Sequence, residues 1–152
     1  MFSNRYVRKA LYEAHVPVLK LSDRSFSTLK EAVLILSNNR DLEKVAATIF
    51  DISEQMSFNL DIYNYMNEHQ DEKELVVEHY NNLSTIFSKT IKILEKDENP
   101  IKVLKQKDNF IQLLPFTQKL TARRIYSLFS TDSEKLYYKL DDYHQIFIPV
   151  QL

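Results

Sequence analysis

The residue types that most often carry out chemistry are present in this sequence but are not spaced for it. The four histidines are His15, His69, His79 and His144. None of them belongs to an H-x-x-x-H or H-E-x-x-H pattern. Glu74 and Glu78 would share one helix face as a carboxylate pair, but a helical di-metal site needs Glu-x-x-His motifs on two helices. The sequence therefore predicts no metal site, no cofactor and no catalytic residue, and we expect a protein that is not an enzyme.

The sequence contains no glycine and no cysteine. Without glycine, the Walker loop, the dinucleotide-binding G-x-G-x-x-G and the nucleophile elbow G-x-S-x-G are all excluded. Without cysteine, disulfides, thiolate nucleophiles and zinc–cysteine sites are excluded, which is consistent with a reducing cytoplasm. The missing glycine, together with abundant Asn, Lys, Ile and Tyr, points to an AT-rich genome such as that of a low-GC bacterium, a virus or a mobile element.

A basic segment between Pro100 and Ile125 is the strongest candidate for binding nucleic acid. Its basic residues are Lys102, Lys105, Lys107, Lys119, Arg123 and Arg124. Phe110, Phe116 and Tyr126 are interleaved with them and would stack on unpaired bases. The alternative is that the basic side chains form a solvated face while the aromatic rings lie in the core. The sequence pI of about 6.4 favours this alternative.

Tyrosine and phenylalanine supply all of the aromatic content, with nine of each and no tryptophan. Most of these rings must lie in the core, but several tyrosines fall at mixed spacings, so some should be exposed. Exposed tyrosine is typical of protein interfaces. The tyrosines at which we expect such an interface are Tyr63, Tyr65, Tyr137, Tyr138 and Tyr143.

The longest predicted element is a helix over residues 71–96. Its apolar or semi-apolar positions alternate in steps of four and three, which indicates one wide buried stripe. They are Val76, Tyr80, Leu83, Phe87, Thr90 and Leu94. Acidic residues lie near the start of this segment and lysines near its end, as the helix dipole favours.

Other segments also show helical spacing. Thr28 and Glu31 form a capping-box pattern for a helix that Asn38 and Asn39 would end. Residues 41–69 would form one helix or two. Shorter helices are predicted over residues 4–14, 101–107, 117–129 and 131–140, whereas residues 109–116 are apolar but too short to be assigned as a helix.

Two segments, 16–21 and 145–151, are extended by pattern and would pair as a minor two-stranded sheet. The predicted fold class is therefore mostly α: a single helical domain over residues 1–152, with about six to eight helices packed around the segment 71–96. No apolar run approaches the roughly 20 residues that a membrane helix requires. We accordingly expect a cytoplasmic protein with no membrane partner.

A chain with amphipathic helices, uneven charge and no catalytic pattern is expected to act by non-covalent binding. The sequence predicts a regulatory or adaptor protein that binds another macromolecule, with a protein as the favoured partner. The first alternative is nucleic-acid binding through the basic segment. The second is a subunit of a larger assembly, or a homodimer in which the helix 71–96 packs on its copy.

Overall fold

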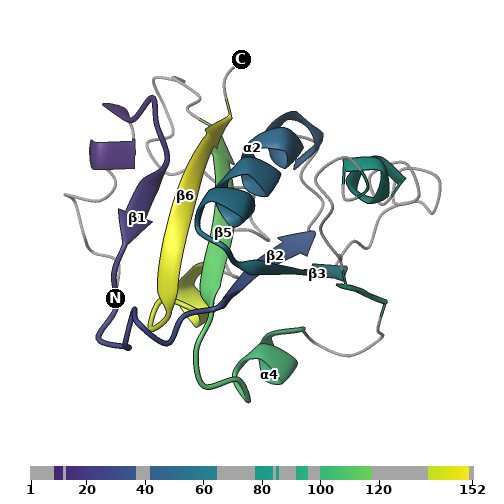
Figure 1. The fold of residues 1–152 in the computed structure, drawn as a ribbon. Coiled ribbons are helices and arrows are strands. Elements are labelled where there is room, and N and C mark those ends of the chain that lie inside the picture. The colour runs from purple at the N-terminus through teal and green to yellow at the C-terminus, as the bar shows by residue number, and fades with distance from the viewer. Residues whose placement is uncertain are drawn as a thin grey trace.

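The fold is known from a computed structural model. The residues that it describes are 9–11, 13–36, 42–64, 78–83, 85, 92–95, 100–117 and 137–150. Six strands form one sheet, with helices packed against both of its faces (Figure 1). In chain order the elements are β1 (Val18–Lys20), β2 (Glu31–Leu36), α2 (Leu42–Gln55), β3 (Asn59–Asn64), β4 (Lys92–Glu95), α4 (Pro100–Leu104), β5 (Ile111–Thr117) and β6 (His144–Val150). Short helical turns are also present at 9–11, 78–83 and 137–139.

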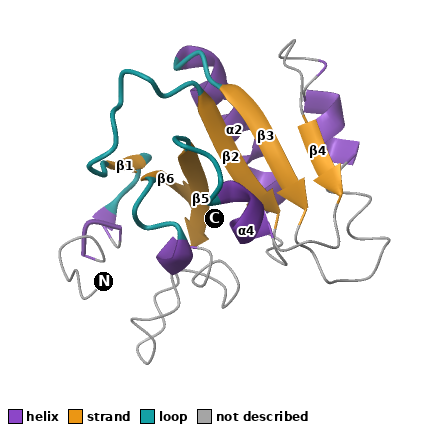
Figure 2. Cartoon of the chain, turned by 90° about the horizontal axis from the view of Figure 1, so that it is seen from below, coloured by secondary structure: helices purple, strands orange, loops and turns teal. Residues whose placement is uncertain are grey.

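The strands lie in the order β1-β6-β5-β2-β3-β4. The five strands from β6 to β4 are parallel to their neighbours, and β1 alone pairs antiparallel, with β6. Figure 2 shows β1 and β4 at opposite ends of the sheet. The chain runs outward from β2 to β3 and β4, then returns to the other side of β2 to form β5 and β6. This reversal is the hallmark of a doubly wound sheet.

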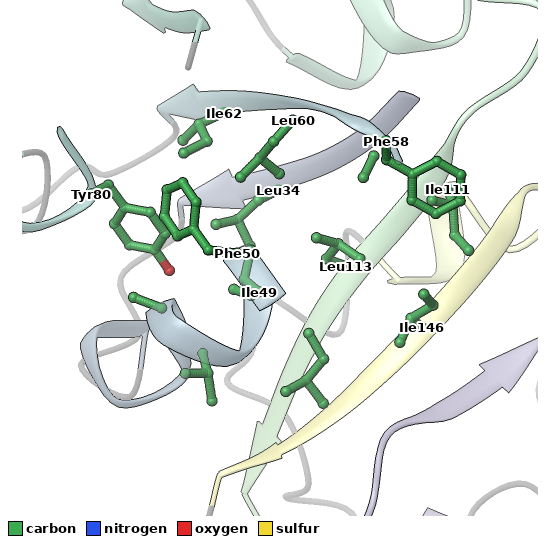
Figure 3. Close-up of a cluster of buried hydrophobic side chains, with 14 of the residues drawn as sticks. Leu34, Ile49, Phe50, Phe58, Leu60, Ile62, Tyr80, Ile111, Leu113 and Ile146 are labelled. Carbon is green, nitrogen blue, oxygen red and sulfur yellow. The ribbon is translucent and has the colours of Figure 1, made fainter. Parts of the chain in front are cut away.

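One face of the sheet packs against α2. Ile49 and Phe50 of the helix lie fully buried against Leu34 of β2 and Leu60 of β3, and the ring of Tyr80 packs beside Phe50 (Figure 3). We call this side the α2 face. Helical spacing in residues 42–55 explains the arrangement, since it gathers the apolar side chains on one side of α2.

The opposite side, the α4 face, is also apolar. Val33 and Ile35 of β2 pack there against Ile101 and Leu104 of α4. Because Ala32 and Leu34 belong to the α2 face, consecutive residues of β2 are buried on opposite sides of the sheet. A parallel strand covered on both faces reads as a continuous apolar run.

The turn from α2 into β3 is made without glycine. Ser57 takes a left-handed conformation with φ of 55°, the only non-glycine residue with positive φ in the described part of the chain. The Phe58 amide donates to the Ser53 carbonyl oxygen at 2.8 Å, which is the six-to-one bond of a Schellman C-cap. A serine thus fills the position that glycine usually takes.

The prediction of a helical bundle is wrong, because the core is a six-stranded sheet. The helix predicted over residues 71–96 is also wrong as a single element: residues 78–83 are helical, but Lys92–Glu95 form β4. The capping-box helix after Thr28 is wrong as well, since Glu31–Leu36 form β2. The physical reason is that short apolar runs buried on both faces of a sheet cannot be distinguished from buried helix by periodicity alone.

The prediction of one helix or two over residues 41–69 is wrong, because within the described residues 42–64 the strand β3 follows α2. The pairing of the segments 16–21 and 145–151 is confirmed, with Val18 opposite Phe147 in an antiparallel register. It belongs to the large sheet, however, and is not a separate ribbon. Helix α4 confirms the start of the helix predicted over residues 101–107. The helix predicted over 117–129 falls outside the described residues except for Thr117, which ends β5.

Candidate interaction surface

Exposed apolar side chains gather around the edge strand β1. Four of the five exposed large hydrophobic residues in the described part of the chain fall between positions 16 and 26. Their exposed fractions are 66% for Val16, 43% for Leu19, 61% for Leu21 and 43% for Phe26, and the fifth residue is Tyr138 at 37%. A run of exposed aliphatic side chains beside a sheet edge is a feature that monomeric proteins normally avoid. We call Val16, Leu19 and Leu21 the β1 edge surface.

Side-chain alternation explains why Leu19 is exposed. Val18 packs against the cluster of Leu114 and Phe147 on the α4 face, and Lys20 reaches the same side. Leu19 lies between them, opposite Ile146, and so points to the α2 face. It remains exposed there although Ile146 is buried. The strand therefore presents an apolar side chain to solvent at the margin of the core.

Lys20 ties β1 to the rest of the sheet. Its Nζ donates to the Asp141 carbonyl oxygen at 3.1 Å and to Gln145 Oε1 at 3.3 Å, and lies 5.5 Å from the centre of the Tyr137 ring. Burial lowers the pKa of Lys20, while Asp141 and Asp142 act to raise it. The ammonium group is thus directed to its own chain and away from the open edge.

The segment after β1 is held by His144 at the start of β6. The Ser22 amide donates to His144 Nδ1 at 3.0 Å, and His144 Nε2 lies 2.9 Å from the Arg24 carbonyl oxygen. Because Nδ1 accepts a hydrogen bond, the ring N–H lies at Nε2, which donates to the carbonyl oxygen of Arg24. The buried imidazole therefore fixes the backbone next to the β1 edge surface.

Arg24 fastens the same segment to two other parts of the chain. Its guanidinium donates to the Asp142 carbonyl oxygen at 3.2 Å, to Asp142 Oδ2 at 3.1 Å and to the Asp108 carbonyl oxygen at 2.5 Å. The guanidinium also lies 3.8 Å from the centre of the Tyr143 ring, which stacks on Phe110. These contacts give the chain beyond β1 a defined path, so the exposure of Leu21 belongs to an anchored segment.

A second polar cluster lies on the α4 face, where Lys107 reaches strands β2 and β3. Its Nζ lies 2.5 Å from Glu31 Oε2 and 3.4 Å from Asp61 Oδ2. Burial raises the pKa of Asp61 above its ordinary value of 3.8; Lys107 opposes this rise and Glu31 adds to it. Burial alone lowers the pKa of Lys107, but its hydrogen bond with Glu31 and the surrounding charges raise it overall.

This cluster predicts a loss of stability at alkaline pH. Burial also raises the pKa of Tyr63 above its ordinary value of 10.0, and the pKa of Lys107 is raised above its ordinary value of 10.5. In the folded chain, both groups therefore keep their protons at pH values where the same groups of the unfolded chain lose them. These two groups hold more protons in the folded state, so their contribution to the free energy of unfolding falls as pH rises through that range. Urea denaturation between neutral pH and pH about 11 should show a shallower fall for Lys107→Met than for the wild type.

Lys105→Met is the matched control, because Lys105 is exposed on the same segment. This variant should keep the wild-type slope of stability against pH. If the free energy of unfolding fell equally steeply with pH in all three proteins, Lys107 would not contribute to the pH dependence of stability.

Of the basic residues predicted to bind nucleic acid, the structure describes Lys102, Lys105 and Lys107. Lys102 and Lys105 are exposed, whereas Lys107 is engaged by two carboxylates. Lys119, Arg123 and Arg124 lie outside the described residues. Phe110 and Phe116 are fully buried and are therefore not available to stack on bases.

Of the five predicted interface tyrosines, the structure describes four. Tyr63, Tyr137 and Tyr143 are buried, Tyr138 is exposed, and Tyr65 lies outside the described residues. Sequence reasoning missed the β1 edge surface. The available signal was the segment 16–21 itself, which is extended and has aliphatic residues on both sides of the strand.

No group of three or more potential metal ligands is found among the described residues. In the same part of the chain, none of the helices has the length and apolar character needed to cross a membrane.

The strand order and the helices on both faces define the class of protein, a doubly wound α/β protein with an antiparallel edge strand. Proteins of this class commonly bind ligands beyond the carboxyl ends of the strands where the strand order reverses, which here is between β2 and β5. The residues that follow these two strands lie outside the described part of the chain. The sequence matches no protein-family model, and no curated protein matches it.

Proposed function

We propose that the protein acts by binding another polypeptide, which adds to the open edge of the sheet at β1 and covers Val16, Leu19 and Leu21. The observation that carries this proposal is the concentration of exposed large apolar side chains around one edge strand. Within the described residues, β1 has one strand neighbour, β6. The side of β1 away from β6 is thus a place where another strand can pair.

The expected affinity is modest. Strand β1 has only three residues, so an added strand would gain few main-chain hydrogen bonds. Contact with Leu19 and Leu21 would supply most of the remaining binding energy, because burying aliphatic surface is favourable. Small interfaces of this kind are typical of transient complexes, and we expect a dissociation constant in the micromolar range.

A polypeptide is a better proposed partner than nucleic acid. The β1 edge surface is aliphatic, and the nearby Lys20 and Arg24 are engaged by acceptors of their own chain. Phosphate binding requires available cations. We propose the cytoplasm as the compartment, because a chain without cysteine forms no disulfide and gains nothing from an oxidising one.

The proposal is tested by selecting random peptides displayed on phage against the full chain. Bound phage are counter-selected against the variant carrying Leu19→Lys and Leu21→Lys, which places charges in the proposed contact. We expect enriched peptides with alternating apolar residues that bind the wild type and not the double variant. Asn82→Lys is the matched control, since it adds a charge at an exposed position in the helical turn 78–83.

The control should bind the selected peptides as the wild type does. Peptides that bind the double variant as well as the wild type would overturn the proposal, and so would a failure to enrich any peptide.

A further inference from the structure

We infer that segment 22–26 is a pH-sensitive switch controlled by His144: the segment is held on the imidazole while the ring is neutral and is released when the ring is protonated. The segment lies between β1 and β2, and His144 is the first residue of β6. The inference uses no property of the β1 edge surface, so it does not depend on the proposed function.

Both ring nitrogens of His144 are bound by backbone groups of this segment. The Ser22 amide donates to Nδ1 at 3.0 Å, and Nε2 donates to the Arg24 carbonyl oxygen at 2.9 Å. The ring of Phe26 lies edge-on to the imidazole, with the two ring centres 5.5 Å apart. Alternate residues of the segment therefore contact one histidine, which is only 1% exposed.

This arrangement fits only the neutral imidazole. An imidazolium ring has two N–H donors and no acceptor, so it cannot accept the hydrogen bond from Ser22. Protonation at Nδ1 would place an N–H of the ring against the N–H of Ser22. The buried charge would add a cost of desolvation. The closed segment thus binds the neutral ring and excludes the charged one.

His144 is also the group around this segment that changes charge near neutral pH. Among the described residues, no carboxylate forms a hydrogen bond or an ion pair with the ring. Carboxylate, guanidinium, ammonium and phenol groups ordinarily keep one charge state between pH 5 and pH 8, whereas histidine changes its own there. The titratable side chains on the elements that meet the ring are Lys20, Asp23, Arg24, Asp108, Asp141, Asp142 and Tyr143.

The segment should therefore open as pH falls. A ring that has left the site can take up a proton, whereas the ring in the closed segment cannot do so without losing the bond from Ser22. Acid accordingly shifts the population towards the open form. The Arg24 guanidinium keeps its bonds to Asp108 and Asp142, because a backbone carbonyl and an ionised carboxylate accept them throughout this range. The opening should thus stay local.

Hydrogen exchange of the Ser22 amide, followed by NMR, tests the inference. Each rate is compared with that of an unstructured peptide at the same pH, so the protection factor reports opening alone. Between about pH 7.5 and about pH 5, we expect the protection of Ser22 to fall at least about tenfold, because a histidine outside the site becomes protonated over this range. The Leu113 amide, in the central strand β5, should keep its protection.

His144→Asn separates the charge of the ring from its role as an acceptor. The asparagine side-chain oxygen can accept from Ser22 and does not titrate. The protection of Ser22 should then be the same at both pH values. His79→Gln is the matched control, since it removes an exposed histidine from the helical turn 78–83 and should leave the change seen in the wild type.

Nitrogen NMR of the imidazole provides a second readout that needs no variant. At about pH 7.5, Nδ1 should be unprotonated and Nε2 protonated, and the ring should take up its second proton over the same pH range in which Ser22 loses protection.

Equal protection of Ser22 at the two pH values in the wild type would overturn the inference. A ring that takes up a proton while Ser22 stays protected would also overturn it, as would an undiminished pH dependence in His144→Asn. None of these results would bear on the binding of selected peptides to the β1 edge surface.

Discussion

Replacing Phe50 by alanine should lower the free energy of unfolding by about 3–5 kcal/mol, because the ring is fully buried where α2 meets the sheet. Phe50 packs with Leu34 and Ile62 on one side, and its ring centre lies 6.0 Å from that of Tyr80 on the other. It therefore joins α2, the central strands and the helical turn 78–83 (Figure 3). Truncation leaves a cavity that three separate elements would have to move to fill.

Urea denaturation at neutral pH measures this effect, and Asp51→Ala is the matched control. Asp51 is the next residue of the same helix and is exposed, so its replacement should change stability by no more than about 0.5 kcal/mol. If the two variants were equally stable, α2 would not pack on the sheet through Phe50.

Replacing Gln145 by leucine should cost about 2–3 kcal/mol, because this buried side chain is the centre of a polar network on the α4 face. Its Nε2 donates to Gln112 Oε1 at 2.9 Å and to the carbonyl oxygens of Tyr137 and Leu140, each at 3.2 Å. Its Oε1 accepts from Lys20. Leucine satisfies none of these groups, and unsatisfied buried polar groups carry the full cost of desolvation.

Gln112→Leu provides an unusually close comparison, since it removes the same type of side chain from the neighbouring strand. The Gln112 Nε2 atom is buried and has no hydrogen-bond partner. Its loss should be nearly neutral, within about 1 kcal/mol, because Gln145 keeps its two carbonyl acceptors. Thermal or urea unfolding of both variants measures the difference between their losses of stability. A larger loss for Gln112→Leu than for Gln145→Leu would contradict the described network.

The sequence was sufficient to predict the pairing of β1 with β6 but not the large sheet to which the two strands belong. Residues 16–21 were recognised as extended from their pattern and β-branched content, the tail 145–151 was recognised as extended as well, and the pairing of the two segments was predicted. Residues 31–36 were not recognised as a strand. Glu-Ala-Val-Leu-Ile-Leu is apolar at consecutive positions, as a strand covered on both faces must be, and the nearby Thr28 and Asn38 imitate the ends of a helix.

The absence of glycine was taken as an indication of helices, and this inference was wrong. Parallel strands are connected by helices and not by tight hairpins, so a doubly wound sheet needs few residues with positive φ. The described turn that requires such a residue uses Ser57. This tolerance of a left-handed serine depends on the packing around α2 and is not visible in the sequence.

The candidate surface was predictable only in part. That segment 16–21 is extended could be inferred, but whether Leu19 faces a neighbour or solvent depends on where the sheet ends. Conversely, Tyr63, Tyr137 and Tyr143 were expected at an interface and are buried. Their surroundings include residues that are distant in the sequence, such as Val33 and Leu104 in the cluster of Tyr63 and Phe110 beside Tyr143.

We propose that a polypeptide binds at the edge of the sheet beside β1, through Leu19 and Leu21. The most direct test is calorimetric titration of a phage-selected peptide into the wild type and into the Leu19→Lys, Leu21→Lys double variant, with circular dichroism confirming that both are folded. We expect micromolar binding to the wild type and no measurable binding to the variant. Equal affinity for the two proteins would contradict it.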